Sequence, residues 1–188
     1  MVTRAAMTRR AVFLDRDGVI NRAVIRDGKP YAPMSLADFE ILPGVAEALA
    51  SLRNAGFLNI AITNQPDVAS GKQRRETVES MHARLMSKLA LHGIKVCYHV
   101  DADRCACRKP KPGLLLEAAE QFGVELRSSF VVGDRWRDVG AGQAAGCKVI
   151  FIDCGYLEKQ PDPPFITVKS LAQAVCVILA EGHAAGRS

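Results

Sequence analysis

An apolar run that ends in two aspartates constrains the fold more than any other stretch. Residues 11–21 read AVFLDRDGVIN, so four apolar residues precede Asp15 and Asp17. The run has the length of a buried strand in a parallel sheet, and open α/β sheets bind ligands at the C-terminal ends of such strands. Both carboxylates lie on one side of an extended backbone, and their repulsion favours a bound cation such as Mg²⁺. A plain strand and polar turn would explain the same residues.

Strand patterns alternate with helical spacing along the chain. Val45, Leu49 and Leu52, for example, recur at the spacing of one helix face. This order is typical of an α/β protein with a doubly wound parallel sheet. No linker or repeat divides it, so we predict a single domain over residues 1–188. We predict strands at 11–14, 57–62, 94–100, 129–132, 147–152 and 165–168, and helices at 45–55, 73–92, 113–123, 135–145 and 170–181.

Two segments need separate interpretation. Residues 22–42 have no strong period, and we predict a functional loop that covers the mouth of the sheet. The helix at 73–92 is amphipathic, and His82 is predicted to be an ordinary helix residue in it. Its buried face is predicted to consist of Val78, Met81, Leu85, Met86 and Leu89.

The composition excludes several classes of protein. Of the 188 residues, 48% are hydrophobic, which suits a globular domain. No apolar run reaches the roughly 20 residues of a membrane span, and Asp15 interrupts the first apolar run too early for a signal peptide, so we expect a cytoplasmic protein. The net charge of +5 suits an anionic ligand. Aromatic residues make up only 6% and the basic residues are dispersed, which argues against nucleic-acid binding.

Polar or charged residues follow four of the predicted strands. In a parallel sheet these strand ends share one edge, so residues far apart in the sequence can meet there. Acids, a hydroxyl group and cations gathered in this way are the components of a phosphoryl-transfer site. The four groups are Asp15 with Asp17, Thr63 with Asn64, Arg108 with Lys109, and Asp134 with Asp138.

Four segments resemble the haloacid dehalogenase superfamily of aspartate-dependent phosphatases, namely AVFLDRDGVIN, AITNQ, CRKPKPG and VVGDRWRD. Within it the chain is similar to the branch of sugar-bisphosphate and histidinol-phosphate phosphatases, from about Val12 to Tyr156. The resemblance implies a Rossmann-like fold, and the short segments after the first two strands leave no room for a large cap domain. It also implies a phosphoric monoester hydrolase for a small sugar phosphate such as D-glycero-D-manno-heptose 1,7-bisphosphate, cleaved at the 7-phosphate.

The resemblance assigns catalytic roles to four residues. Asp15 would be the nucleophile and form an aspartyl-phosphate intermediate. Asp17 would protonate the leaving sugar oxygen and then activate the water that hydrolyses the intermediate. Thr63 and Lys109 would hold the phosphoryl oxygens, one through a hydroxyl group and the other through a point charge.

The same resemblance implies a magnesium site and substrate contacts. Mg²⁺ would be held by Asp15, the backbone carbonyl of Asp17, and Asp134. Asp138 is expected to be a helix residue or to lie behind these ligands. The substrate-binding residues that the resemblance implies are Asn64, Arg108 and Arg135.

Three cysteines and a histidine gather just before the predicted basic pair. Cys97, His99, Cys105 and Cys107 fall within eleven residues. A tetrahedral Cys₃His zinc site accounts for this set, and such a site has no open position, so its zinc would be structural. It would hold the loop at about residues 97–108, although unrelated thiols would explain the spacing as well. The other cysteines, predicted to be small buried residues, are Cys147, Cys154 and Cys176.

Several functions stay open at this point. The short loop between His99 and Cys105 favours histidinol phosphate as the substrate, and another sugar-pathway phosphate is a further alternative. A zinc-stabilised binding protein or a phosphatase of nucleic-acid ends would belong to a different class. Pro66-Asp67 stands where the family usually has Ser-Gly, so the resemblance does not fix the substrate. We expect a monomer with a small phosphorylated sugar as its partner, and no nucleic-acid or membrane partner.

Overall fold

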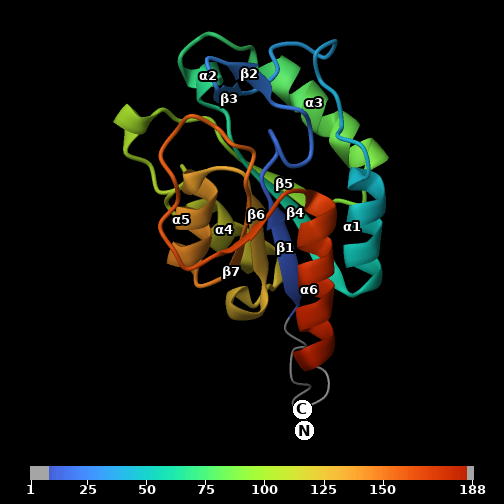
Figure 1. The fold of residues 1–188 in the computed structure, drawn as a ribbon. Helices are drawn as coiled ribbons and strands as arrows, with labels where there is room; N and C mark the ends of the chain where they lie inside the picture. Colours follow the sequence, from blue (N-terminus) through green and yellow to red (C-terminus); the bar gives the residue numbers. More distant parts are fainter. Residues whose placement is uncertain (1–8, 186–188) are drawn as a thin grey trace, which may run out of the picture.

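A six-stranded parallel sheet forms the centre of the protein (Figure 1). The computed structural model describes residues 9–185. From β1 the chain builds outward to β5, returns to β6 beside β1, and builds outward again to β8. The strand order therefore reverses between β1 and β6, which is where open α/β sheets bind ligands, and the predicted doubly wound sheet is confirmed. The strands are β1 (Arg10–Leu14), β4 (Phe57–Asn64), β5 (Gly93–Cys97), β6 (Phe130–Gly133), β7 (Lys148–Ile152) and β8 (Ile166–Val168), in the order β5-β4-β1-β6-β7-β8.

Helices cover both faces of this sheet. Val12 and Leu14 of β1 share a core with α1, α3 and α6, whereas Ala11 and Phe13 share a second core with α4 and α5. All four residues are fully buried, as expected for a central strand with helices on both sides. The helices are α1 (Val45–Asn54), α3 (Arg75–Lys88), α4 (Gly113–Phe122), α5 (Trp136–Ala145) and α6 (Leu171–Ala185).

The predicted loop at residues 22–42 contains a small β-hairpin. Strands β2 (Val24–Arg26) and β3 (Lys29–Tyr31) pair in antiparallel fashion. Asp27 and Gly28 join them with φ angles of 50° and 72°, and two central residues with positive φ are the mark of a type I′ turn. Figure 1 places this hairpin beside the short helix α2 (Pro66–Ala69), beyond the carboxyl end of the sheet, so the loop covers the mouth as predicted.

Several predictions about burial were wrong. Met86 is 43% exposed although it was assigned to the buried face of α3, because that face is narrower than the apolar pattern indicated. His82 lies in α3 as predicted, and its side chain is buried. Cys154 and Cys176 are exposed and only Cys147 is partly buried, so the expectation of three buried thiols fails.

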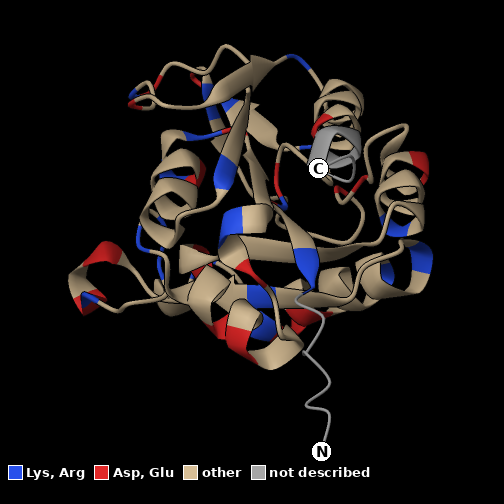
Figure 2. Ribbon diagram, turned by 90° about the horizontal axis from the view of Figure 1, so that it is seen from below, with Lys and Arg blue, Asp and Glu red and all other residues tan. Residues whose placement is uncertain are grey.

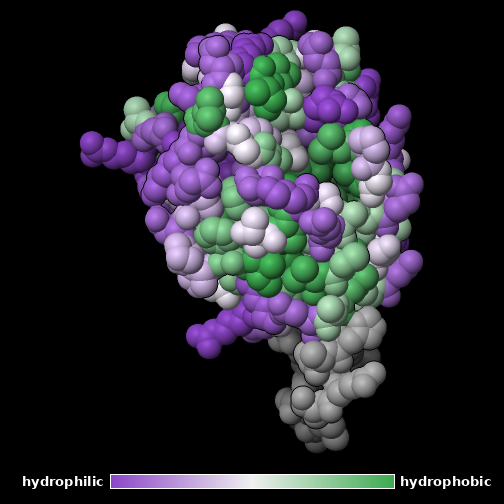
Figure 3. Space-filling view, viewed as in Figure 1, coloured by the Kyte–Doolittle hydropathy of each residue, from purple (hydrophilic) through white to green (hydrophobic). Residues whose placement is uncertain are grey.

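Charges of both signs are spread over the ribbon, as the dispersed basic residues of the sequence indicated (Figure 2). On the face shown in Figure 3, apolar side chains gather in the lower centre and hydrophilic side chains surround them. No helix in the described part of the chain is long and apolar enough to cross a membrane. Residues 1–8, where the sequence argues against a signal peptide, lie outside the described residues.

Candidate active site

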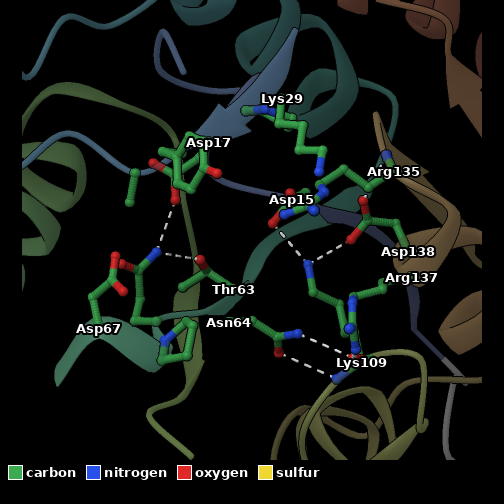
Figure 4. Close-up of a pocket in the computed structure, with 15 residues that line it drawn as sticks. Asp15, Asp17, Lys29, Thr63, Asn64, Asp67, Lys109, Arg135, Arg137 and Asp138 are labelled. Carbon is green, nitrogen blue, oxygen red and sulfur yellow. Dashed lines mark hydrogen bonds and ion pairs between the residues drawn. The ribbon is translucent and has the colours of Figure 1, made fainter. Parts of the chain in front are cut away.

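The strand ends that the sequence singled out meet in one cavity of about 220 Å³ (Figure 4). Asp15 follows β1, Thr63 lies near the end of β4, and Asp134 follows β6. Because β4 and β6 flank β1 and run parallel to it, their carboxyl ends come together beside it. Six of the predicted site residues line the cavity: Asp15, Asp17, Thr63, Asn64, Lys109 and Arg135.

Lys109 joins the candidate nucleophile to a second acid. Its Nζ lies 2.7 Å from Asp15 Oδ1 and 2.5 Å from Asp138 Oδ1, and it donates to the carbonyl oxygen of Ile62 at 3.0 Å. The side chains of this ion-paired trio are almost fully buried. Burial and the charge of Asp138 raise the pKa of Asp15 to about 6, and Lys109 opposes the shift. Burial alone would lower the pKa of Lys109, but the two carboxylates raise it.

Asp138 contributes more to this site than the sequence indicated. It lies in the first turn of α5, as expected, and its Oδ2 accepts a hydrogen bond from the backbone N–H of Arg135 at 3.0 Å. Its carboxylate also contacts Lys109 directly. The carboxylates of Asp15, Asp134 and Asp138, called the acid group below, have oxygen atoms within 4.8 Å of one another.

Asp134 leaves one carboxylate oxygen free for a ligand. Tyr156 donates its hydroxyl to Asp134 Oδ2 at 2.8 Å, whereas Oδ1 is buried without a hydrogen-bond partner among the described residues. Burial and the charge of Asp15 raise the pKa of Asp134 well above its ordinary value. An orphaned oxygen among several buried carboxylates fits a divalent cation with oxygen ligands. The carboxylate of Asp17 is not a member of the acid group; the prediction assigned the ligand role to its backbone carbonyl.

The glycine that follows Asp17 is required for a steric reason. Gly18 has a φ of 98°, and a Cβ atom there would lie 1.9 Å from Asp134 Oδ2 and 3.0 Å from the hydroxyl of Tyr156. A side chain would therefore occupy the position of the Asp134 carboxylate, and the backbone conformation itself disfavours other residues. The sharp exit from β1 brings the main chain close to the predicted metal ligand.

A fully buried arginine that the sequence analysis did not single out holds Asp17. Arg16 Nε and Nη2 lie 3.2 and 2.9 Å from the carboxylate oxygens of Asp17, and its Nη1 lies 3.0 Å from His82 Nε2. An arginine only donates, so His82 accepts through a neutral ring; burial, reinforced by the charge of Arg16, lowers the pKa of His82 to about 4. Although burial acts to raise the pKa of Asp17, the charge and hydrogen bonds of Arg16 hold it below its ordinary value.

Gln65 connects Asp17 to Thr63. Its Nε2 donates to Asp17 Oδ2 and to Thr63 Oγ1, both at 2.8 Å. Within the described residues the hydroxyl hydrogen of Thr63 has no acceptor, so it is available for a ligand in the cavity. Asn21 donates to the other oxygen of Asp17 at 2.9 Å. Asn21 and Gln65 each lie within four residues of a predicted catalytic residue in the sequence, and this proximity is the signal by which they could have been identified.

The predicted substrate-binding residues differ in what they contact. Asn64 lines the cavity, but its amide donates to the carbonyl oxygen of Lys109 at 3.1 Å and accepts from the N–H of Lys109 at 3.2 Å. It therefore fixes the backbone that carries the lysine. Arg135 also lines the cavity, and its guanidinium is forked onto Glu158 at 2.8 and 2.6 Å.

Arg108 is not brought into the cavity with Asp15. Its Nε donates to Asp101 at 2.7 Å and its Nη1 to the carbonyl oxygen of His99 at 3.2 Å, so it braces the loop that precedes Lys109. Arg137 lines the cavity in its place. Arg108 lies in a loop, where no period determines the direction of its side chain, whereas Arg137 lies in the first turn of α5, at a helix position that the sequence analysis did not consider for the site.

The cysteines and histidine of the predicted zinc site are assembled. Distances between the Sγ atoms of Cys97, Cys105 and Cys107 range from 3.1 to 3.7 Å, and His99 Nδ1 lies 3.2 Å from Cys107 Sγ. A zinc ion with Zn–S bonds of about 2.3 Å in a tetrahedron sets S–S distances of about 3.7 Å. These four side chains, called the thiol group below, are therefore close to the arrangement that zinc requires.

Comparison with known proteins agrees with the motifs. A family model described as HAD-hydrolase-like, where HAD abbreviates haloacid dehalogenase, matches residues 106–174. The chain is 38% identical over 154 residues to the D-glycero-β-D-manno-heptose-1,7-bisphosphate 7-phosphatase of Pseudomonas aeruginosa, covering 79% of this chain and 84% of that protein. It is 36% identical over 197 residues to the D-glycero-α-D-manno-heptose-1,7-bisphosphate 7-phosphatase of Mycobacterium bovis, covering 99% and 98% of the two chains.

A solved structure is similar over nearly the whole chain. The D,D-heptose 1,7-bisphosphate phosphatase from B. bronchiseptica, complexed with magnesium and phosphate, has a TM-score of 0.79 and 30% identity, covering 92% of this chain and 99% of that one. The similarity of sequence and of fold confirms the resemblance based on the four motifs. The chain belongs to the haloacid dehalogenase superfamily, in the branch that contains the D-glycero-D-manno-heptose-1,7-bisphosphate 7-phosphatases.

Proposed function

We propose that this protein is a Mg²⁺-dependent phosphatase that removes the 7-phosphate of D-glycero-D-manno-heptose 1,7-bisphosphate. One observation carries the proposal: Asp15, Lys109 and Asp134 meet at the carboxyl end of the central strands, in or beside one cavity. A buried carboxylate next to a lysine and an orphaned acid suits covalent phosphoryl transfer. The relatives named above act on this heptose bisphosphate, which supports the choice of substrate.

Asp15 is the nucleophile in this mechanism. It attacks phosphorus, the bond to the sugar oxygen breaks, and an aspartyl-phosphate forms. The free hydroxyl hydrogen of Thr63 donates to a phosphoryl oxygen, and Lys109 keeps the Asp15 carboxylate oriented while its charge offsets the charge of the phosphate.

Asp17 transfers the proton. It donates a proton to the leaving sugar oxygen, and in the second half of the cycle it takes one from the water that attacks the aspartyl-phosphate. In the free protein Arg16 holds the pKa of Asp17 low, which suits the base. An anionic phosphate arriving beside Asp17 disfavours its charged form and so favours the acid.

The acid group fits the magnesium ion that this mechanism uses. Asp15, Asp134 and the backbone carbonyl of Asp17 would hold the ion, and the orphaned Oδ1 of Asp134 is the observation that fits it. When bound, Mg²⁺ neutralises negative charge on the phosphate and on the acids around it.

The thiol group fits a structural zinc ion. Cys97, His99, Cys105 and Cys107 would fill all four positions of a tetrahedron, which leaves none for a reactant. The ion would therefore hold the loop that leads to Lys109.

We further propose that residues 1–188 form one domain and that the protein acts as a monomer in the cytoplasm, which gel filtration and cell fractionation can test.

A phosphate-release assay with Mg²⁺ tests the function. The substrates are both anomers of the heptose bisphosphate, because relatives of each anomeric type align well, together with histidinol phosphate and hexose phosphates. We expect the highest kcat/KM for one heptose bisphosphate, with the 1-phosphate left on the product. Histidinol phosphate as the best substrate would contradict this assignment, and release from DNA ends would contradict the substrate class. Metal analysis of the same sample should find one zinc per chain.

A further inference from the structure

One cation in the cavity has no partner of its own. Lys109 is bound to two carboxylates, and Arg135 and Arg137 are bound to Glu158 and Asp101. Lys29 also lines the cavity, yet no hydrogen bond or ion pair involves its side chain within residues 9–185. Figure 4 shows this side chain reaching from the hairpin toward the part of the cavity that holds Asp15 and Arg135.

The hairpin fixes the position of Lys29 at the edge of the cavity. Lys29 is the first residue of β3 and pairs with Arg26 across the tight turn. The turn is bound to the loop after β7, because the N–H of Leu157 donates to the carbonyl oxygen of Gly28 at 2.8 Å. A Cβ atom on Gly28 would lie 2.6 Å from the side chain of Leu157, so the two segments are in close contact. The backbone of Lys29 is therefore anchored at the edge of the cavity, while its side chain has no salt bridge.

The distribution of charges in the cavity indicates a function for Lys29. In the proposed mechanism the phosphate attacked by Asp15 lies next to Thr63 and Lys109 at the strand ends, which supply a hydroxyl donor and a cation for one phosphoryl group. Lys29 enters the same cavity from the opposite side, on a segment outside the central sheet. A ligand with one phosphate would leave this ammonium group unpaired. A ligand with a second anionic group would pair it, since lysine binds phosphate as a point charge on a flexible stem.

We propose that Lys29 binds the second phosphate of a bisphosphorylated sugar and makes the enzyme prefer bisphosphates to monophosphates. The proposal rests on the proposed function, because it assumes that Asp15 attacks the first phosphate. Lys29 is a binding residue in this scheme and takes no part in bond making or breaking. It acts on the affinity for the substrate and not on the rate of the chemical step.

Substitution of Lys29 tests the proposal with two substrates. The variant is Lys29→Met, and the substrates are the heptose 1,7-bisphosphate and the heptose 7-phosphate, assayed with Mg²⁺. Hydrogen bonds to charged groups correspond to a loss of about 10- to 100-fold in binding. We therefore expect KM for the bisphosphate to rise by about that factor with kcat nearly unchanged, and kcat/KM for the monophosphate to stay nearly constant. Lys29→Arg, which keeps the charge, should recover most of the loss.

Arg26→Met is the matched control. It removes the same charge from the partner strand of the hairpin, and Arg26 does not line the cavity. Its KM for the bisphosphate should change by less than about twofold, since an exposed charge acts only weakly through solvent. A similar rise in Arg26→Met would overturn the proposal, because it would show a general effect of net charge.

Three further results would be decisive. An unchanged KM for the bisphosphate in Lys29→Met, or an equal rise for both substrates, overturns the role of Lys29 and leaves the proposed function intact. A wild-type protein that releases no phosphate from the bisphosphate overturns the proposed function, and the role of Lys29 with it. Lys29 is exposed, so the thermal midpoint of Lys29→Met should equal that of the wild type, and this measurement confirms that the variant is folded.

Discussion

The acid group and the thiol group are both sets of ligand side chains, but the fold supports them differently. All three members of the acid group are buried at the carboxyl ends of the central strands, where burial and neighbouring carboxylates raise the pKa of Asp15 and the pKa of Asp134. Of the thiol group only Cys97 is buried, and the group lies where the edge strand β5 leaves the sheet. The first group concentrates charge for chemistry, whereas the second cross-links a loop that has little apolar core. Reactivity and local stability are therefore located in separate parts of the molecule.

Lys109 is the physical connection between the two groups. It follows Cys107 by two residues, its backbone is held by the amide of Asn64, and its Nζ contacts Asp15 and Asp138. Any effect of the thiol group on the chemistry must pass through the position of this lysine. Substitutions in the acid group, in the thiol group and at Lys109 should therefore have distinguishable effects on activity and on stability.

The largest effect is expected from Asp15→Asn. An amide cannot form the aspartyl-phosphate, so kcat should fall by about 10⁴-fold or more. The free energy of unfolding should stay the same or rise, because the substitution removes repulsion from Asp138 and Asp134 inside the acid group. Phosphate release and urea unfolding of the same preparation measure the two quantities.

Asp67→Asn is a suitable control for that substitution. Asp67 lines the same cavity but lies in α2, outside the acid group. Loss of the charge at Asp67 should leave kcat nearly unchanged. Comparable losses in the two variants would mean that the cavity needs negative charge in general and not a nucleophile at position 15.

The second largest effect is expected from Lys109→Met, which removes the connection between the acid group and the thiol group. Loss of one preorganised cation at a site of developing charge lowers kcat by about 10²- to 10³-fold. Removal of the buried counter-charge also leaves two carboxylates unpaired, which should lower the free energy of unfolding by about 3–5 kcal/mol. Lys95→Met is the control, because Lys95 pairs with the exposed Glu117 and should contribute less than about 1 kcal/mol. A stable and active Lys109→Met protein would remove the connection proposed between the two groups.

The sequence was a good guide to the acid group and a poor guide to the residues around it. Buried parallel strands are continuous apolar runs, so the ends of β1, β4 and β6 could be located, and the topology then brings Asp15, Thr63 and Asp134 together. Arg16 and His82 were missed because their contact joins the end of β1 to a helix far away in the sequence, and only the other partner of Arg16, Asp17, is its neighbour in the chain. No local pattern in the sequence contains that pairing.

The thiol group and the loops show a second limit. The close spacing of four soft or borderline ligands indicated the thiol group, although unrelated thiols would have explained the same spacing. The direction of Arg108 could not be predicted, since it depends on contacts with Asp101 and the turn that follows β5. The hairpin was also missed, although Asp27-Gly28 is a known turn signal. Its strands have only three residues each, which is too short for a periodic pattern.

The third prediction concerns the thiol group. In the proposed zinc-bound protein, removal of the ion with a chelator, or Cys105→Ser, should lower the thermal midpoint by roughly 10 °C, since metal binding stabilises the folded state directly. Turnover at low temperature should fall only severalfold, because the loop still carries Lys109 and Asn64 still holds it. Cys176→Ser, which alters an exposed thiol far from the group in the sequence, should change neither quantity. Complete loss of activity in a folded, zinc-free protein would give the thiol group a part in the chemistry.

The smallest effect is expected from His82, at the outer end of the network that holds Asp17. Burial lowers its pKa from 6.5 to about 4, so below pH 6.5 the unfolded chain binds a proton that the folded protein does not. Stability is therefore complete above pH 6.5 and falls as the pH drops toward 4, by at most about 3 kcal/mol. His82→Gln keeps an acceptor for Arg16 without titrating, and its unfolding free energy should depend less steeply on pH in this window, as urea titrations at several pH values will measure. Equal slopes in variant and wild type would show that the histidine is not held neutral and so does not accept a hydrogen bond from Arg16.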